Sequence, residues 1–231
     1  MIEISDLSKI YSGTTVLKIP SLRIEDGESF GLVGNNGAGK TTLFRLILDI
    51  AEASTGEVKI GGLPIARRDE WKHSVGSFLD EGFLIDFLTP EEYFLFIGKM
   101  YGKNRQQTMD FLASMEELFS GEILGGKKFI RDLSKGNQKK VGIAAAMLGE
   151  PEILILDEPF TALDPSSQIR LKNMLSDMQA TKGTTLLISS HDLNHITDVC
   201  QRIVVLEHGN IVKDIATADN TLSELESYFK V

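Results

Sequence analysis

The sequence has a single cysteine, Cys200, so it cannot form an internal disulfide. This shortage of cysteine is typical of a reducing compartment. We expect Cys200 to be a packing residue of a helix over Asp192–Gln201 rather than a nucleophile. No apolar run approaches the ~20 residues that a membrane-spanning helix needs. Glu3 and Asp6 interrupt the start of the chain, where a leader would be apolar, so we expect a cytoplasmic protein.

A basic excess is missing as well. The 231 residues include 24 Lys and Arg against 33 Asp and Glu, which gives a formal net charge of −9. General nucleic-acid binders usually carry a basic excess, so the composition argues against that class without excluding a local basic patch. With 42% hydrophobic and 25% charged residues, the chain has the balance of a globular protein, as one large domain or a domain with a subdomain.

The stretch Ser29–Phe44 organises the chain, because an apolar strand end, a glycine-rich turn and a helix follow one another there. The turn fits G-x-x-x-x-G-K-[ST], a pattern that cradles phosphate with backbone N–H groups and the positive end of the next helix. Lys40 supplies a cation for terminal phosphates, and the Thr41 hydroxyl is a ligand for Mg²⁺. The predicted nucleotide-binding residues here are Gly34, Asn35, Asn36, Gly37, Ala38, Gly39, Lys40, Thr41 and Thr42.

The first part of the chain predicts a small, mostly antiparallel sheet that leads into this phosphate loop. Alternating apolar residues or short apolar runs predict strands over Met1–Leu7, Val16–Ile19 and Leu22–Ile24. A helix over Lys40–Ile50 has apolar residues at helical spacing and should bury one face.

From Phe83 to Glu150 the pattern is mainly helical, including helices from Thr89 to Met100 and over Arg105–Phe119. Apolar runs at Ile153–Leu156 and Thr185–Ser189 then predict parallel strands that are covered on both faces. We expect an α/β fold in one domain over 1–231. It has a phosphate-loop core with a mostly parallel sheet, an N-terminal antiparallel subdomain and a helical subdomain inserted at about 83–150.

Two carboxylates, Asp157 and Glu158, follow the run Ile153–Leu156. The carboxyl ends of strands border the ligand crevice in open α/β sheets. One carboxylate can hold Mg²⁺ through water, and the next can orient or deprotonate an attacking water. His191 follows another covered strand, where it could contact the γ-phosphate or that water, although a lone histidine is more often structural.

Several segments occur in an order that resembles the nucleotide-binding subunits of ATP-binding cassette transporters, over nearly the whole chain. Segment 133–138 is the most specific, since phosphate loops and acidic strand ends occur in many other ATPases. The segments are Gly34–Thr42, Leu133–Gln138, Ile153–Glu158, Ala162–Asp164 and His191.

The resemblance implies a role for four residues of the chain's own site. Tyr11 matches the aromatic residue that stacks on adenine, and Asp157 matches the aspartate that supports Mg²⁺. Glu158 matches the catalytic base, and His191 matches the switch histidine. The implied cofactors are ATP and Mg²⁺.

Ser134 and Gly136 match the family's signature segment, which in one subunit completes the ATP site of the other. Ser134 is also a predicted N-cap, so the helix behind it would direct its dipole at an anion in front. Lys135 and Asn137 depart from the usual Leu-Ser-Gly-Gly-Gln, and Lys135 adds a positive charge beside the expected γ-phosphate. Asp164 matches the aspartate of the loop that links the two sites across a dimer.

Asp80 stands where the family usually has a glutamine that senses Mg²⁺ and the attacking water. It is shorter and charged, and could still hold the metal through water. In the family, the neck at this position and the helical subdomain dock a short helix of the membrane subunit. Some of the apolar residues near the neck could form that groove, or all of them could pack the subdomain core: Phe78, Phe83, Leu84, Ile85, Phe87 and Leu88.

The resemblance implies the ATP-hydrolysing subunit of a transporter on the inner face of the cell membrane. Its partners would be a second nucleotide-binding subunit, as a copy or a paralogue, and integral membrane permease subunits, with no nucleic acid. One alternative is a soluble cassette ATPase of DNA repair or translation, which usually has a coiled coil, paired cassettes or basic extensions. Another is a regulator that binds nucleotide without turnover. The short stretch after Val212 and the segment Gly76–Tyr101 favour an exporter.

Overall fold

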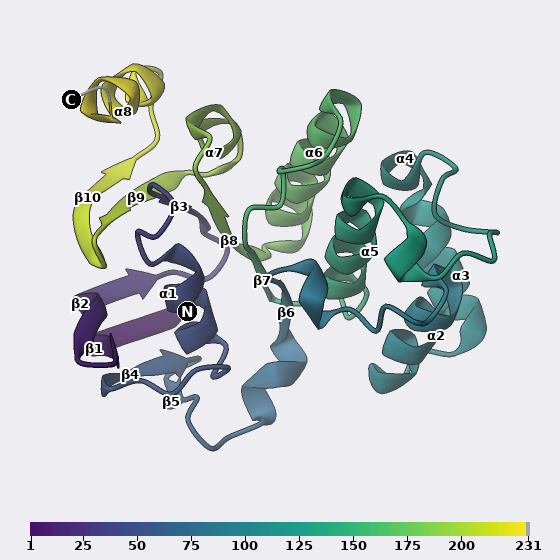
Figure 1. Ribbon diagram of the computed structural model, residues 1–231, viewed down its shortest axis with the longest axis horizontal. Helices are drawn as coiled ribbons and strands as arrows, with labels where there is room; N and C mark the ends of the chain where they lie inside the picture. Colours follow the sequence, from purple (N-terminus) through teal and green to yellow (C-terminus); the bar gives the residue numbers. More distant parts are fainter. Residues whose placement is uncertain (230–231) are drawn as a thin grey trace.

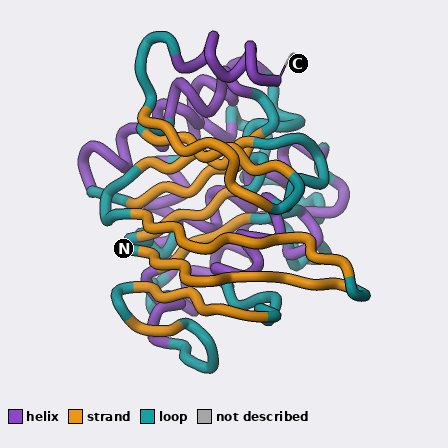
Figure 2. The backbone as a smooth tube through the Cα atoms, turned by 90° about the vertical axis from the view of Figure 1, so that its left-hand side faces the viewer, coloured by secondary structure: helices purple, strands orange, loops and turns teal. Residues whose placement is uncertain are grey.

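The computed structural model describes residues 1–229, which form two sheets and a group of helices. In Figure 1 the smaller sheet lies at one side, the larger sheet crosses the centre, and helices α2 to α5 gather at the other side. The small sheet has the order β2-β1-β4-β5, and the large sheet has the order β10-β9-β3-β8-β7-β6. Figure 2 shows the strands of both sheets running side by side, with helices packed above and behind them.

The elements alternate in the manner of an α/β protein, and their bounds are as follows. The strands are β1 Ile2–Tyr11, β2 Thr14–Ile24, β3 Ser29–Val33, β4 Thr55–Ile60, β5 Leu63–Pro64, β6 Val75–Phe78, β7 Ile153–Leu156, β8 Thr185–Ser190, β9 Arg202–Glu207 and β10 Asn210–Ala216. The α-helices are α1 Lys40–Ile47, α2 Pro90–Met100, α3 Arg105–Ser114, α4 Glu116–Phe119, α5 Lys135–Met147, α6 Pro165–Lys182, α7 Leu193–Val199 and α8 Thr221–Phe229. Short 3₁₀ helices cover Glu70–Ser74, Glu81–Phe83 and Ile130–Asp132.

The large sheet is parallel except for its edge strand β10, which confirms the predicted mostly parallel core. β3 lies between β8 and β9, and every residue of β3, β7 and β8 is buried, as expected for strands covered on both faces. β3 therefore belongs to this sheet, whereas β1, β2, β4 and β5 pair antiparallel in the other. The turn after β3 places the phosphate loop at the carboxyl edge of the large sheet.

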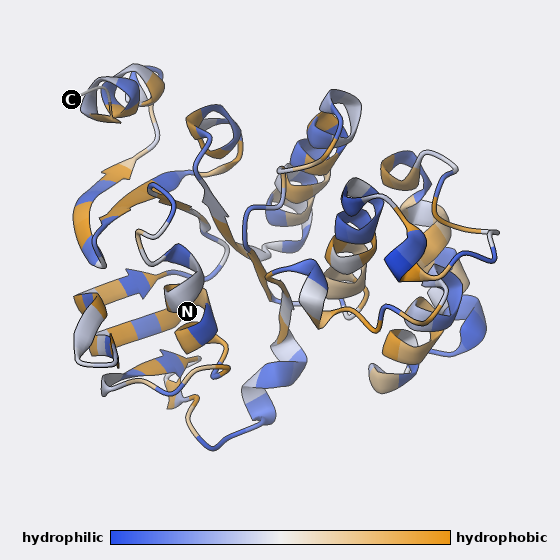
Figure 3. Ribbon diagram, viewed as in Figure 1, coloured by the Kyte–Doolittle hydropathy of each residue, from blue (hydrophilic) through white to orange (hydrophobic). Residues whose placement is uncertain are grey.

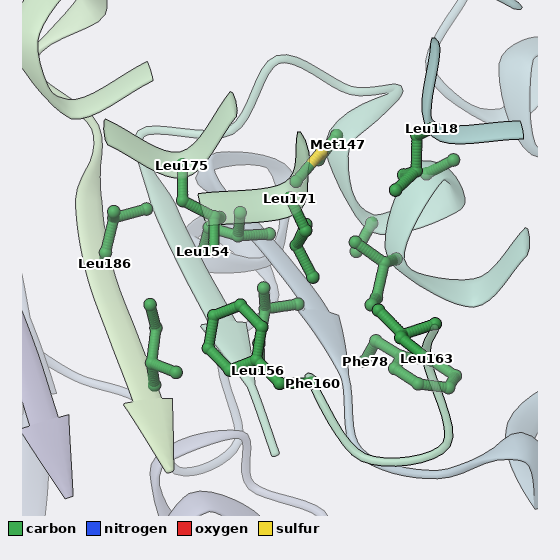
Figure 4. Close-up of a cluster of buried hydrophobic side chains, with 14 of the residues drawn as sticks. Phe78, Leu118, Met147, Leu154, Leu156, Phe160, Leu163, Leu171, Leu175 and Leu186 are labelled. Atoms are coloured by element: carbon green, nitrogen blue, oxygen red, sulfur yellow. The ribbon is translucent and has the colours of Figure 1, made fainter. Parts of the chain in front are cut away.

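Buried side chains fill the space between the sheet and its helices. Figure 4 shows Leu154 and Leu156 of β7 among Leu171 and Leu175 of α6, with Phe160 beside them. Figure 3 shows that the central strands are hydrophobic, whereas the outer faces of the helices are hydrophilic. Cys200 is 3% exposed in this core, which confirms it as a packing residue, and burial raises the pKa of its thiol. It does not lie within the predicted helix, because α7 ends at Val199 and Cys200 is its extended C-cap.

Along the sequence, the chain forms helices α2, α3, α4 and α5 after β6 and before β7, although these two strands are neighbours in the large sheet. Capping boxes at Thr89 and Asn104 precede α2 and α3, so residues close in sequence determine where these two helices begin. α5 contacts α2 and α4 but also β6 and β7, so it joins the helical group to the sheet. The bounds 83–150 of an inserted subdomain stay a prediction.

Several predicted element bounds were wrong, including the first strand, which runs to Tyr11 rather than Leu7, and the helix expected over Asp192–Gln201, which ends at Val199. One strand, β2, continues through Pro20 where two were expected, because β2 is an edge strand and the missing N–H of proline is needed by no neighbour there. The helix after the phosphate loop ends at Ile47, because Asp49 adopts a left-handed backbone (φ 52°). The helix expected over Arg105–Phe119 is two helices, α3 and α4, that meet at Met115.

Candidate functional site

The phosphate loop joins β3 to α1 and depends on its glycines. Gly37 and Gly39 have φ values of 84° and 109°, a left-handed region that glycine enters at little cost. A Cβ on Gly34 would lie 2.3 Å from the carbonyl oxygen of Leu206, so the loop can pass β9 closely. Gly39 is the N-cap of α1 and has no side chain to cap it, which leaves the positive helix end facing the loop.

The Lys40 side chain spans this loop and the acidic end of β7. Lys40 is 6% exposed, and its Nζ donates a hydrogen bond to the Gly34 carbonyl at 2.5 Å. The same Nζ lies 3.3 Å from Oε1 of Glu158. A buried ammonium needs such partners, and a nucleotide phosphate can exchange with them as a stronger acceptor.

Asp157 follows β7 directly, is 5% exposed and accepts hydrogen bonds from two hydroxyls. Thr41 Oγ1 donates to its Oδ2, and Ser189 Oγ, from the end of β8, donates to its Oδ1. Residues 1–229 hold no group of three His, Cys, Asp or Glu side chains that could bind a metal by themselves. A Thr hydroxyl beside one carboxylate still suits Mg²⁺, which takes few protein oxygens and completes its shell with phosphate oxygens and water.

Glu158 adopts a left-handed backbone conformation, with φ 48°. Its Oε2 lies 2.9 Å from Nδ1 of His191, and its side chain is 22% exposed. Its buried Oε1 faces Lys40 and has no hydrogen-bond partner among the described residues. A carboxylate beside a phosphate loop can accept a proton from water, and backbone strain of this kind is often found at functional sites.

A cavity of about 320 Å³ brings most of the predicted phosphate-loop residues together with Tyr11 and Glu158, whereas Gly34, Asp80, Asp157 and His191 are not in its wall. Its wall comprises Tyr11, Val16, Asn35–Thr42 and Glu158. Tyr11 ends β1 and is 47% exposed, with Nζ of Lys9 4.8 Å from its ring centroid. The cavity therefore offers an aromatic face, a phosphate cradle and a carboxylate within one space, which suits a nucleoside triphosphate.

Ser134 and Gly136 are absent from the lining of this cavity. Ser134 caps α5, and its Oγ accepts a hydrogen bond from Asn137 N at 3.2 Å. Gly136 lies against the loop before α6, where a Cβ would be 2.6 Å from the Ala162 carbonyl oxygen. Asp164 ends that loop and caps α6, and hydrogen bonds from Ser166 and Ser167 lower the pKa of its carboxyl.

Asp80 caps the 3₁₀ helix Glu81–Phe83. Its Oδ1 accepts a hydrogen bond from Gly82 N at 2.8 Å, and its Oδ2 lies 3.9 Å from Nη2 of Arg45. Neither contact involves Thr41 or Asp157, so a role for Asp80 in metal binding stays a prediction.

Sequence reasoning missed Ser189, Arg45 and Lys139, which contact Asp157, Asp80 and the Glu158 carbonyl respectively. Ser189 carried a signal, since it lies at the carboxyl end of a covered strand, two residues before His191, next to the strand that Asp157 follows. Arg45 and Lys139 carried none, because their partners come from other parts of the chain.

A phosphate loop at the carboxyl edge of a mostly parallel sheet defines a class, the phosphate-loop nucleotide-binding proteins. Within that class, the chain belongs to the ABC transporter family, whose model matches residues 17–161. It is 33% identical over 216 residues to the bacitracin transport ATP-binding protein BcrA of Enterococcus faecalis, covering 93% of this chain and 69% of that one. It is 31% identical to the linearmycin resistance ATP-binding protein LnrL of Bacillus subtilis, covering 97% and 72%.

Solved structures agree on the fold. The ATP-binding subunit of an ABC transporter superposes with a TM-score of 0.83 at 28% identity, covering 99% of this chain and 93% of the other. A dimeric post-hydrolysis state of the cassette MJ0796, bound to ADP and Pi, also gives 0.83 at 24% identity, covering 94% and 99%. The chain spans 62% of an uncharacterized ABC transporter ATP-binding protein of Synechocystis with 33% identity. No helix within residues 1–229 is long and apolar enough to cross a membrane.

Proposed function

We propose that this chain is the ATP-binding and ATP-hydrolysing subunit of a membrane transporter. The observation that carries the proposal is the convergence of Tyr11, the phosphate loop and Glu158 on one cavity. Tyr11 stacks on the adenine, while Lys40 and the loop N–H groups hold the phosphates. Glu158 takes a proton from the attacking water, and His191 holds the Glu158 carboxylate in place.

Mg²⁺ would be held by Thr41 and Asp157, where it would neutralise charge on the β- and γ-phosphates. Ser189 keeps the Asp157 carboxylate turned toward Thr41 by donating to its other oxygen. The donors on Asp157 therefore fix the oxygens that would meet the metal.

The proposed unit is a head-to-tail dimer on two Mg·ATP, with the signature of one chain completing the site of the other. Ser134 and Gly136 lie outside the cavity of their own chain, which supports a contact with a partner's nucleotide. The exposed Lys135 at the first turn of α5 would add a cation beside the partner's γ-phosphate. The MJ0796 cassette has been solved as a dimer.

Mixing two inactive variants tests the shared site. Lys40→Ala removes the phosphate cation, and Ser134→Arg places a bulky side chain at an exposed signature position. A mixed dimer keeps one site with both parts intact, so an equal mixture should recover roughly a quarter of normal phosphate release. Unaltered chain mixed equally with the double variant provides the control. Its mixed dimers keep no intact shared site, so only the unaltered homodimers should release phosphate, roughly a quarter of the normal rate, against roughly a half if each chain completed its own site. Absence of any recovery in the first mixture contradicts a site shared between copies of this chain.

The membrane subunits are proposed to dock beside the neck. A cavity of about 410 Å³ lies there, between the edge of the large sheet and α2, and Phe83, Tyr93, Ile97 and Met100 line it. Phe83 and Met100 are 53% and 68% exposed, so the groove presents apolar side chains to a partner helix. The structure divides the predicted apolar set: Phe78 is buried, Leu84, Ile85 and Leu88 pack against the core, and Phe83 and Phe87 are exposed.

A charge placed in this groove should separate the chain from its membrane partner. Phe83→Asp with Met100→Asp should reduce co-purification of an integral membrane protein from the native host by about 10-fold or more, because two apolar anchors are lost. Leu63→Asp, at a similarly exposed site on β5, is the control and should co-purify normally. ATP binding by the isolated double variant should be unchanged. Co-purification of the unaltered chain with ribosomes or DNA would contradict a transporter and favour a soluble cassette ATPase.

For the direction of transport we propose export from the cytoplasmic face of the membrane. Two relatives are named for bacitracin transport and linearmycin resistance, and a third, 31% identical, is a methionine import protein of Carboxydothermus hydrogenoformans. Flux across vesicles that contain the assembled transporter, with ATP supplied on one face, measures the direction.

A further inference from the structure

One turn into helix α5 lie three buried polar side chains that the proposed function leaves without a role. Gln138, Lys139 and Lys140 are 8%, 6% and 3% exposed. Burying an ammonium group is costly unless polar partners replace its water. The partners of Lys139 therefore show what its charge is used for.

Lys139 binds the turn that follows β7. Its Nζ donates hydrogen bonds to the Glu158 carbonyl oxygen at 2.8 Å and to Oγ1 of Thr161 at 2.6 Å. Thr161 Oγ1 itself donates to the Glu158 carbonyl at 2.8 Å. The backbone N–H of Thr161 donates to the same oxygen at 3.4 Å, so the peptide oxygen of the proposed base accepts two hydrogen bonds from its own turn and one from α5.

The same ammonium group reaches the neck. Its Nζ lies 3.8 Å from Oε1 of Glu81, in the 3₁₀ helix that links β6 to the helical group. Burial lowers the pKa of Lys139, and Glu81 is the carboxylate that raises it most. In Figure 1, α5 stands beside β6 and β7, the strands that Glu81 and Glu158 follow.

These contacts matter because the Glu158 backbone is strained. A left-handed conformation in a non-glycine residue costs about 1–3 kcal/mol and persists when its surroundings hold it. The φ of 48° at Glu158 accompanies a side chain directed at both Lys40 and His191. A peptide that relaxed would turn the carboxylate away from the phosphate loop.

We propose that Lys139 is a positioning residue for Glu158, and that Glu81 sets the place of Lys139. A displacement of the neck then moves the ammonium group, and with it the peptide that aims the base. The inference rests on the proposed role of Glu158 in hydrolysis.

Lys139→Met tests it, because methionine keeps much of the side-chain length without the charge. We expect kcat for ATP hydrolysis to fall about 10- to 100-fold, as for a small misplacement of a catalytic group. The Kd for ATP should stay within about 2-fold, because the phosphate loop is untouched. Lys139→Arg, which keeps the charge and several donors, should recover part of kcat. Lys172→Met is the matched control, since Lys172 is also a largely buried lysine but pairs with Asp198 of α7 rather than with Glu158 or Glu81.

A double-variant cycle separates positioning from a general loss of packing. Glu81→Gln should lower kcat less than Lys139→Met, and the two together should be no worse than Lys139→Met alone, because Glu81 acts through Lys139. Lys139→Gln gives the same comparison if the methionine variant folds poorly by thermal melting. A normal kcat in Lys139→Gln or Lys139→Met, an equal loss of ATP affinity and kcat, or additive effects would overturn the inference.

A failure of the proposed function can be distinguished from a failure of the proposed role of Lys139. If Glu158→Gln still hydrolyses ATP, the assignment of the base is wrong. If Glu158→Gln is inactive while Lys139→Met is normal, the base stands and the positioning role is wrong.

Discussion

Lys40→Ala is expected to abolish ATP binding at ordinary nucleotide concentrations. The ammonium group already lies at the carbonyl of Gly34 and at the Glu158 carboxylate, inside a cavity formed mainly by the phosphate loop. A charge-assisted hydrogen bond contributes about 1.5–3 kcal/mol, and the terminal phosphates offer Lys40 more than one. Loss of about 3 kcal/mol or more corresponds to at least about 100-fold in Kd.

The measurement is a titration of the purified variant with ATP, followed by heat or by a fluorescent analogue. Lys18→Ala is the control, because Lys18 is an exposed lysine of β2 that is not part of the cavity wall. Its affinity should equal that of the unaltered chain. An unchanged Kd in Lys40→Ala would remove the claim on which the proposed function depends.

The phosphate loop and the acidic strand end could be predicted because their signals are local. A strand, its turn and the next helix are adjacent in sequence, and the left-handed φ at Gly37 and Gly39 needs the residue type that stands there. Asp157 and Glu158 follow an apolar run directly. The parallel sheet then brings these ends to one edge, as any such sheet does.

What could not be predicted depends on tertiary placement. The pairs Arg45–Asp80 and Glu81–Lys139 join segments that are distant in sequence, and no spacing rule links their members. The resemblance did predict Tyr11 as an adenine-stacking residue, but the residues alone gave no reason for β1 to end at the phosphate loop. The pairing of β1 with β2 places it there, with Val16 of β2 in the same cavity wall.

The strand break predicted at Pro20 shows that the fold, too, depends in part on tertiary placement. A proline normally ends a predicted strand because it lacks an N–H, yet β2 pairs on one side with β1, and Ile19 and Ser21 keep their partners on either side of Pro20. Whether a strand lies at an edge is a property of the whole sheet. A prediction from local propensity therefore gave two strands, whereas the sheet contains one continuous strand.

Glu158→Gln is expected to bind ATP and to persist as a closed dimer. Glutamine has nearly the same shape but accepts no proton at its amide, so the attacking water would no longer be deprotonated, while the proposed contacts of Lys40 with phosphate and of Thr41 with Mg²⁺ would be kept. Loss of a general base costs about 10²- to 10⁴-fold in rate. Phosphate release should fall by that factor, and the ATP-bound dimer should elute intact from a sizing column.

The same substitution distinguishes a hydrolytic cassette from a regulator that binds nucleotide without turnover. A regulator would show no release before the change and no difference after it, whereas the proposed ATPase loses a measurable rate and gains a long-lived dimer. Glu57→Gln, on β4 and paired with Lys59, is the control and should keep both the rate and the ATP-dependent exchange of subunits. Hydrolysis at the normal rate in Glu158→Gln would place the base elsewhere, and the strained φ at Glu158 would then need another explanation.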